Sequence, residues 1–181
     1  GRQQGIAKAV GISKLSDLQV LDGTGGLGRD AFTLAALGAR VTVVERSPVV
    51  AALLLDALRR AQEQPGLQAA ASRMAVCHAE TLDALTQGRV DVVYLDPMYP
   101  DDGKRALPAK EMQILRDLTG GDADADALLV PALEAARRRV VVKRPLKAPP
   151  LAGCKPGLVF AGTQARFDVY LKPSAPPVRS G

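Results

Sequence analysis

The feature that most constrains the fold is a regular alternation of short Val-rich segments with longer segments of helical periodicity. Such alternation predicts a parallel sheet, because each helix carries the chain back to the edge where the previous strand began. The last two apolar segments have no helix between them and are expected to close the sheet as an antiparallel pair. Strands are expected at residues 18–22, 41–45, 74–77, 90–95, 140–143, 158–161 and 167–171, and helices at residues 29–37, 48–63, 81–85, 109–118 and 124–138.

The composition fits one globular unit. The 181 residues suit a single domain with one interior. Hydrophobic residues make up 47% of the chain and aromatic residues 3%, so the interior must be built from Val, Leu, Ala and Ile. We expect one domain over residues 1–172 and a flexible tail over residues 173–181, which are rich in Pro and Ser.

The charge balance is basic. Lys and Arg number 24 against 19 Asp and Glu, a net charge of +5. This favours polyanions such as nucleic acid, although a solvated surface without a partner is an equally open interpretation. Cys77 and Cys154 indicate neither a disulfide framework nor a metal site, and they fit a reducing compartment. No apolar run is long enough to span a membrane and no signal peptide is visible, so we expect a cytoplasmic protein.

A glycine-rich loop joins the first expected strand to the first helix. Gly23, Gly25 and Gly28 have the G-x-G-x-x-G spacing, and Asp22 enters the loop. Glycine permits positive φ and lets a ligand approach the backbone closely, while the helix N-terminus offers N–H groups without intrahelical partners. The spacing alone is weak evidence and also fits a turn. Its place between a strand and a helix favours a cofactor site.

Glu45 ends the second strand, where a carboxylate can accept hydrogen bonds from both hydroxyls of a ribose. A solvated strand-end acid is the alternative. The loop and the acid fit NAD and S-adenosylmethionine (SAM) equally, because both carry an adenosine ribose. Asp22 and Asp30 favour SAM, since carboxylates suit its cationic sulfonium and amino group and oppose a pyrophosphate. We therefore predict an α/β, Rossmann-like fold of the class I SAM-dependent methyltransferase type, with a mostly parallel seven-stranded sheet and helices on both faces.

The fourth strand runs directly into Asp96-Pro97-Met98-Tyr99-Pro100. This resembles the D/N-P-P-Y/F motif of amino-methyltransferases, with Met98 in place of the second proline. An exocyclic amine has a delocalised lone pair, so it must be held in line with the S–CH₃ bond. The Asp96 side chain and the Pro97 carbonyl can accept its two N–H groups, and Tyr99 can stack on the substrate ring. A rigid turn with a buried Tyr is the alternative. Positioning and electrostatics would supply the catalysis, without a metal.

Five segments of the chain together resemble one family. They are GGLGRDAF (25–32), ERSPVVAA (45–52), YLDPMYP (94–100), VVVKRP (140–145) and RFDVY (166–170). Over residues 5–171 the chain resembles the ribosomal RNA small subunit methyltransferase J family. The resemblance implies methyl transfer from SAM to the exocyclic N2 amine of a guanine in 16S ribosomal RNA, with S-adenosylhomocysteine as product and the RNA or the small ribosomal subunit as partner.

The resemblance also implies a set of donor-binding positions. At the third strand end the family commonly has a pair of serines where this chain has Glu80-Thr81, and the longer acid could still bind the adenine amino group. Family members carry an additional segment before the position of Gly1, so we expect a shortened chain or a shorter homologue that would modify RNA poorly if that segment binds RNA. The implied donor contacts are Arg29, Asp30, Glu45, Arg46, Glu80, Thr81 and Asp96.

Several basic residues are candidates for RNA contact. Lys104 and Arg105 follow the loop after the fourth strand and could steer the phosphate backbone. Lys143 and Arg144 end the fifth strand, where an RNA contact and a structural ion pair are equally open. The run of arginines at 137–139 is expected to form a solvated helix end that complements the helix dipole.

Two further functions remain open from the sequence. An NAD-dependent oxidoreductase could use the same glycine-rich loop, although the single histidine, His78, is poorly placed for proton transfer. A Rossmann-like RNA-binding module could keep the pocket and do no chemistry. Binding of S-adenosylhomocysteine against NADH would separate the first of these from a methyltransferase.

Overall fold

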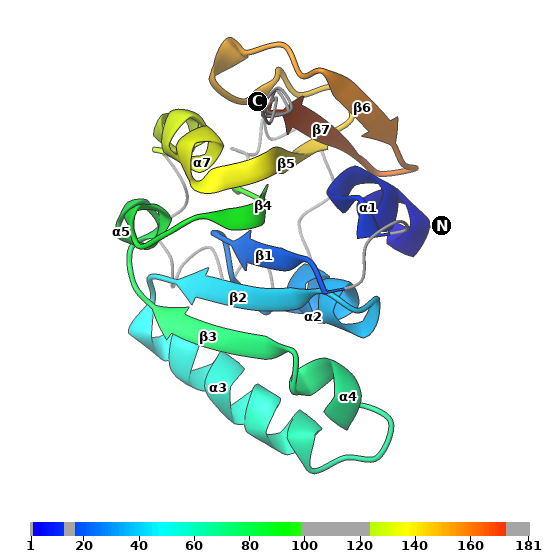
Figure 1. The fold of residues 1–181 in the computed structure, drawn as a ribbon, viewed down its shortest axis with the longest axis vertical. Coiled ribbons are helices and arrows are strands. Elements are labelled where there is room, and N and C mark those ends of the chain that lie inside the picture. The colour runs from blue at the N-terminus through cyan, green and yellow to red at the C-terminus, as the bar shows by residue number, and fades with distance from the viewer. Residues whose placement is uncertain (1, 13–16, 99–123, 173–181) are drawn as a thin grey trace, which may run out of the picture.

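A seven-stranded sheet forms the centre of the computed structural model, which describes residues 2–12, 17–98 and 124–172 (Figure 1). The strand order is β3-β2-β1-β4-β5-β7-β6. Strands β1 to β5 run parallel to one another, and β7 runs antiparallel to both β5 and β6. The predicted mostly parallel sheet and its antiparallel closing pair are confirmed. The strands are β1 (Gln19–Asp22), β2 (Arg40–Glu45), β3 (Met74–His78), β4 (Val90–Leu95), β5 (Ala136–Pro145), β6 (Leu158–Ala161) and β7 (Ala165–Leu171).

Helices cover both faces of this sheet, as Figure 1 shows. Helices α1 and α2 pack on one face, and α5 and α7 on the other. The expected helix over residues 109–118 and the expected tail over residues 173–181 lie outside the described residues. The helices are α1 (Arg2–Val10), α2 (Arg29–Ala36), α3 (Pro48–Gln62), α4 (Gln68–Ala71), α5 (Thr81–Thr86) and α7 (Leu129–Ala135), with short 3-10 turns at Ala125–Leu128 and Leu151–Gly153.

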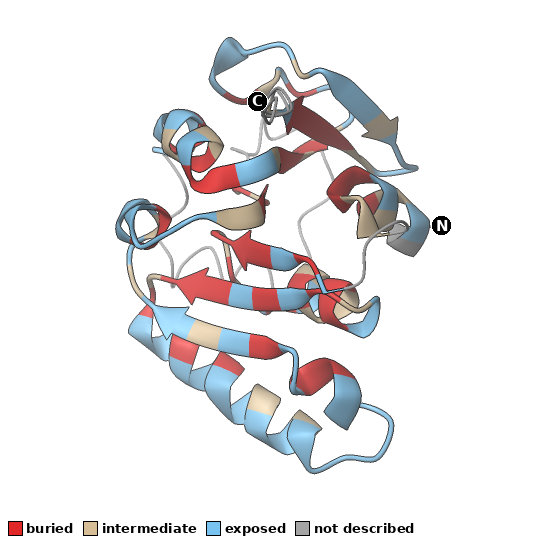
Figure 2. Cartoon of the chain, in the orientation of Figure 1, coloured by how far each residue is buried: buried red, intermediate tan, exposed pale blue. Residues whose placement is uncertain are grey.

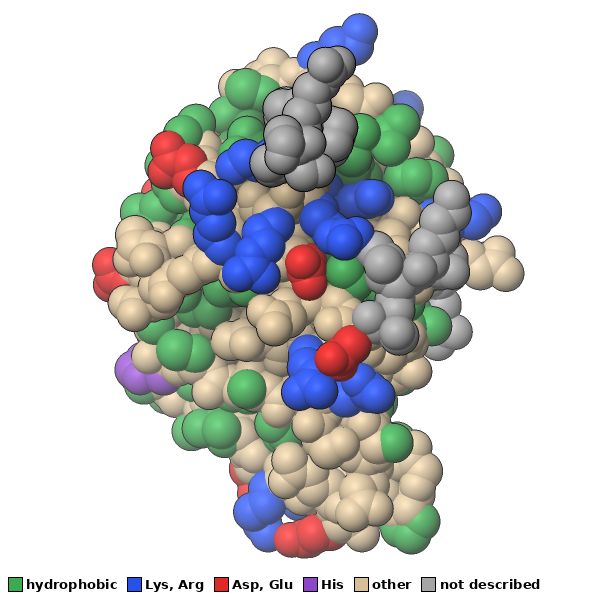
Figure 3. Space-filling model, in the orientation of Figure 1, with side chains coloured by type: hydrophobic (Ala, Val, Ile, Leu, Met, Phe, Trp, Pro, Cys, Tyr) green, Lys and Arg blue, Asp and Glu red, His purple; other side chains and the backbone are tan. Residues whose placement is uncertain are grey.

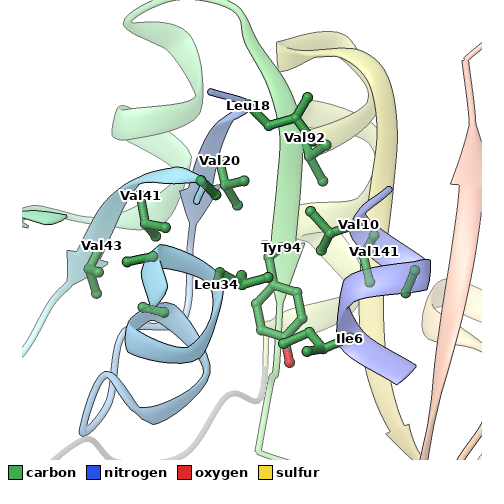
Figure 4. Close-up of a cluster of buried hydrophobic side chains, with 14 of the residues drawn as sticks. Ile6, Val10, Leu18, Val20, Leu34, Val41, Val43, Val92, Tyr94 and Val141 are labelled. Atoms are coloured by element: carbon green, nitrogen blue, oxygen red, sulfur yellow. The ribbon is translucent and has the colours of Figure 1, made fainter. Parts of the chain in front are cut away.

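The period-2 alternation of strand β4 divides the interior into two clusters. Val92 and Tyr94 contribute to the cluster under α1 and α2, whereas Val93 and Leu95 contribute to the cluster under α5 and α7. The Tyr94 ring lies among apolar side chains of the first cluster (Figure 4). Figure 2 shows buried residues concentrated in the central strands. The middle of the sheet therefore has both faces buried, as strands of a parallel sheet require.

Helix α3 illustrates how local sequence fixes an element. Ser47 caps its N-terminus by accepting a hydrogen bond from the Val50 N–H at 3.4 Å, and Pro48 occupies the first helical turn. Arg59 and Arg60 lie in the last turn, where cations complement the dipole. The prediction of a helix from Pro48 is confirmed to within one residue at its C-terminus.

The prediction of a helix over residues 124–138 is wrong in its last three residues. Helix α7 ends at Ala135, and Ala136 has an extended backbone that begins β5. Strand β5 is longer than predicted because it pairs with β4 on one side and with β7 on the other. The arginines at 137–139 therefore lie in a strand and do not form a helix end. Arg138 lies 3.7 Å from an Asp91 carboxylate oxygen, and Arg139 donates to the Ala9 carbonyl at 3.1 Å.

Helices α1 and α4 were not expected from the sequence, and α1 packs against the C-terminal strands β6 and β7 (Figure 1). Within the described ranges, no helix combines the length and the apolar character needed to cross a membrane.

Candidate functional site

The candidate site lies at the edge of the sheet where the parallel strands end. Strand order reverses between β1 and β4, because the chain proceeds from β1 to β2 on one side and from β4 to β5 on the other. Asp22, the last residue of β1, pairs with Val43 of β2 and with Tyr94 of β4. Helix α2 begins seven residues later at Arg29. In open α/β sheets, ligands bind at such a switch point.

The glycine-rich loop is held against two strands by its backbone. The Gly23 N–H donates to the Tyr94 carbonyl at 3.0 Å, and the Gly25 N–H donates to the Val44 carbonyl at 2.9 Å. A Cβ atom at Gly25 would lie 2.8 Å from that same Val44 oxygen. Glycine is therefore required at this position by the protein's own strand β2, and the predicted approach of a ligand to the loop stays a prediction. Positive φ angles occur in this loop at Gly26 and Gly28.

Threonine hydroxyls connect this loop to its surroundings. Thr81, at the start of α5, donates to the Gly23 carbonyl at 2.6 Å. Thr24 accepts a hydrogen bond from the Asp96 N–H at 2.6 Å, and its own hydroxyl and N–H donate to Asp22 Oδ1 at 3.2 and 3.0 Å. Thr24 thus links the acid that ends β1 to the acid that follows β4. Sequence reasoning did not identify this role, because an x position in a glycine motif carries no pattern of its own.

Asp22 is a buried carboxyl group with 2% relative exposure. Burial raises the pKa of Asp22 from 3.8 to about 7, despite the two hydrogen bonds from Thr24 that lower it, and the nearby negative charges of Asp30 and Asp96 raise it further. Asp22 therefore exchanges its proton near neutral pH.

The raised pKa of Asp22 predicts that the protein loses stability as pH rises. Between pH 3.8 and about 7 the folded chain keeps a proton that the unfolded chain has released, so Asp22's stabilising contribution is complete below this window and lost across it. The shift corresponds to at most about 4 kcal/mol. Asp22→Asn keeps an acceptor oxygen for Thr24. We expect urea titrations of this variant to show a smaller fall in the free energy of unfolding across the window. Equal slopes for both proteins would contradict the assignment.

Glu45 is a second buried acid, and both of its carboxylate oxygens accept backbone hydrogen bonds. Oε2 accepts from the Gly26 N–H at 2.8 Å, and Oε1 accepts from the Ser47 N–H at 2.7 Å. Glu45 therefore ties the glycine-rich loop to the beginning of α3. Each oxygen keeps a second lone pair, so the geometry is compatible with the predicted ribose contact.

Around the end of β4, four polar side chains form one cluster, which we call the Asp30–Lys143 cluster: Tyr94, Asp30, Asp96 and Lys143. The Tyr94 hydroxyl donates to Asp30 Oδ2 at 2.7 Å. The Lys143 ammonium donates to the same Asp30 oxygen at 2.8 Å and to Asp96 Oδ2 at 2.5 Å. Three secondary-structure elements, α2, β4 and β5, meet in this cluster.

The charges of the cluster follow from these contacts. Burial lowers the pKa of Lys143, but the Asp96 and Asp30 carboxylates outweigh it and leave that pKa raised. Burial, with the charges of Asp96 and Asp30, holds the pKa of Tyr94 well above its ordinary value. Lys143 is thus an ammonium and Tyr94 a neutral phenol at neutral pH.

The other predicted donor contacts lie on the same edge of the sheet. Arg29 is exposed in the first turn of α2, and Glu80 is exposed directly before α5. Arg46 is half-buried, with its guanidinium 3.8 Å from an Asp124 carboxylate oxygen. Pro97 is buried beside Asp96. Within the described ranges, no group of three or more His, Cys, Asp or Glu side chains is placed to hold a metal ion.

The candidate RNA contacts separate into three cases. Lys104 and Arg105, together with the predicted stacking residue Tyr99, lie outside the described residues. Arg144 has 5% relative exposure and donates to the Pro149 carbonyl from Nε at 3.0 Å and from Nη2 at 2.8 Å. This favours the structural alternative for Arg144 over a phosphate contact. Lys143 forms the ion pairs described above.

Comparison with known proteins is consistent with this geometry. The model of the SAM-dependent methyltransferase family, SAM_MT, matches residues 1–172. The ribosomal RNA small subunit methyltransferase J of Shewanella oneidensis is 55% identical over 176 residues, which cover 95% of this chain and 70% of that protein. The protein of the same name from Shewanella sp. strain MR-4 is 54% identical over 175 residues, which cover 95% of this chain and 67% of the relative.

Solved structures of methyltransferases are also similar to this chain. A SAM-dependent methyltransferase from Neisseria gonorrhoeae matches with a TM-score of 0.77 at 40% identity, covering 98% of this chain and 70% of the other. A 16S rRNA N2 G1207 methyltransferase from T. thermophilus, solved with AdoMet and guanosine, matches with a TM-score of 0.63 at 21% identity, covering 93% of this chain and 41% of the other. At that identity the second likeness concerns the fold.

Proposed function

Because this chain belongs to the SAM-dependent methyltransferase family that includes the ribosomal RNA small subunit methyltransferase J proteins, we propose that it methylates the exocyclic N2 amine of a guanine in 16S ribosomal RNA. The observation that carries the proposal is the identity of about 54% to the curated relatives over 95% of the chain. The alternatives of an NAD-dependent oxidoreductase and of a non-catalytic module have no such support.

The residues at the carboxyl edge of the sheet fit the methyl donor. Three carboxylates, those of Asp22, Asp30 and Asp96, lie close enough for their charges to interact. Such a cluster suits a ligand with a sulfonium and an amino group and would oppose a pyrophosphate. When bound, SAM supplies an electrophilic methyl group. Glu45 would hold the ribose hydroxyls, and the other proposed donor contacts are Gly23, Gly25, Arg29, Arg46, Glu80 and Thr81.

Asp96 and Pro97 are the proposed catalytic groups. The Asp96 carboxylate and the Pro97 carbonyl would each accept one N–H of the amine, which directs the nitrogen lone pair at the methyl carbon. As the N–C bond forms, the S–CH₃ bond would break, with S-adenosylhomocysteine as the leaving group. The nitrogen becomes tetrahedral and then loses one proton to Asp96 or to water. Because the amine and the methyl group are held in line, the bimolecular reaction becomes effectively unimolecular, which lowers its barrier. Tyr99 remains the proposed stacking platform for the base.

An RNA partner is supported by charge. The chain has a net charge of +5, and on the face shown in Figure 3 Lys and Arg side chains gather over the middle of the molecule with acidic side chains among them. Lys104 and Arg105 remain candidates for phosphate contact. A cytoplasmic location belongs to the same proposal, since that is where a bacterial small subunit is assembled.

The proposal is tested by finding where the methyl group goes. Purified protein is incubated with methyl-labelled SAM and with small ribosomal subunits that lack the modification, or with the naked RNA. The RNA is then digested and its nucleosides are separated by mass. We expect label in N2-methylguanosine. Label in a different nucleoside, or none from a chain that binds S-adenosylhomocysteine, would contradict the proposed substrate.

A further inference from the structure

We infer that Lys143 is a positioning residue for methyl transfer, whose ammonium holds the Asp96 carboxylate in place. The inference rests on the catalytic role proposed for Asp96. It assigns Lys143 to the reaction centre, whereas the sequence left an RNA contact and a structural ion pair equally open.

The strand register places Lys143 beside the catalytic loop. Val142 of β5 pairs with Leu95, the last residue of β4, so Lys143 and Asp96 each lie one position further along neighbouring strands. Side chains alternate between faces along a strand. Val141 packs under α1 and α2 and Val142 packs under α5 and α7, so Lys143 points to the same face as Tyr94 and α2. Arg144 consequently belongs to the opposite face.

The contacts of Lys143 fix Asp96 at its carboxylate. The ammonium lies 2.5 Å from Asp96 Oδ2, and the Asp96 N–H is held independently by the Thr24 hydroxyl at 2.6 Å. Lys143 is itself held by Asp30, which also accepts from Tyr94 on the same oxygen. A residue anchored at its backbone and at one carboxylate oxygen has little freedom to rotate. Asp96 therefore presents its carboxylate in one orientation.

Exposure distinguishes this role from the two alternatives. The Lys143 side chain has 16% relative exposure and Asp30 has 13%, whereas Asp96 has 38%. A phosphate contact would require the ammonium to leave two carboxylates. A purely structural ion pair would not need one partner at an accessible edge, and buried pairs contribute little net stability. Lys143 and Asp30 instead form mostly buried contacts that hold an accessible catalytic group, Asp96, in place.

The charge of the cluster predicts different effects of a Lys143 substitution on the transfer rate and on donor affinity. Replacing Lys143 by Met removes one positive charge next to Asp30 and Asp96, which makes this edge of the sheet more negative. A more negative site attracts the cationic donor at least as strongly as before. A positioning role therefore predicts slower transfer without weaker donor binding. Loss of a structural contact would lower both together.

The experiment compares Lys143→Met and Lys143→Arg with wild type and with Lys155→Met, which removes the same charge from an exposed position. Single-turnover methyl transfer is measured at saturating SAM and RNA, and SAM affinity is measured by calorimetry. We expect a rate about 10²-fold lower for Lys143→Met, with recovery of at least about tenfold in Lys143→Arg, because loss of alignment by about 1 Å costs that much. Donor affinity of Lys143→Met should be unchanged or tighter. Lys155→Met should match wild type.

A pH series adds a readout that a structural role would not move. The titratable groups in or next to the cluster are Asp22, Asp30, Asp96 and Tyr94. Without the ammonium, protonation of the carboxylates becomes more favourable, so the acidic limb of the rate profile should move to higher pH.

Two results would overturn the inference: a Lys143→Met rate within about twofold of wild type, or a parallel loss of rate and donor affinity that Lys143→Arg does not recover. Failure of the proposed function is distinguishable from both, because the wild-type chain would then fail to bind SAM or to methylate RNA.

Discussion

Asp96→Asn is expected to lower the rate of methyl transfer by about 10³-fold, the range seen when one preorganised catalytic hydrogen-bond partner is removed. The amide has the shape of the carboxylate but lacks its charge and turns one acceptor into a donor. Its NH₂ group would therefore face either the amine or the Lys143 ammonium, and that donor would lose its acceptor. Single-turnover kinetics at saturating SAM measures this step.

The affinity for the donor should fall much less than the rate, by no more than about tenfold, because Asp96 shares donor binding with several other residues. Asp83→Asn makes the same chemical change at an exposed position on α5 and should behave as wild type. If Asp96→Asn turned over at the wild-type rate, Asp96 would have no part in the mechanism.

Glu45→Gln is expected to weaken donor binding and to lower the stability of the protein. The Glu45 oxygens accept from the Gly26 and Ser47 N–H groups, so an amide NH₂ must face one of these donors. A buried N–H left without an acceptor costs about 1–3 kcal/mol. We expect a loss of that size in the free energy of unfolding by urea titration. The dissociation constant for S-adenosylhomocysteine should rise about 10²-fold, because the ribose loses a charged acceptor and the loop loses its tether.

The matched control is Glu63→Gln, which removes an acid from the exposed end of α3. It should change the unfolding free energy by less than about 1 kcal/mol, as is usual for a surface ion pair. Unchanged donor affinity in Glu45→Gln would contradict the proposed contact between Glu45 and the ribose.

The local elements of the fold were predictable from sequence because local rules determine them. Ser47 and Pro48 define where α3 begins, and Gly38 follows the end of α2. Strand β5 was predicted too short because its first residues are stabilised by pairing with distant strands: Ala136 and Arg139 pair with β4, and Arg139 also pairs with β7. Non-local pairing of this kind overrides local propensity. Helix α1 was missed for a similar reason, since it packs against strands more than 140 residues away.

The acids of the candidate site were also predictable, because the ends of parallel strands meet at one edge of the sheet. Asp22, Glu45 and Asp96 each end or follow such a strand. Their partners were not predictable, since hydrogen bonds such as that from Asp96 to Thr24 depend on side-chain geometry. Lys143 is an intermediate case. Both Lys143 and Arg144 lie in β5, so the alternation of side chains along the strand is enough to place them on opposite faces of the sheet.

A crystal structure of this chain with S-adenosylhomocysteine tests most directly whether the carboxyl edge of the sheet binds the methyl donor. We expect the ribose hydroxyls on the Glu45 carboxylate and the amino-acid end of the ligand beside Asp30 and Asp96, above the ends of β1, β2 and β4. Density for the ligand at any other place, with this edge of the sheet unchanged, would contradict it.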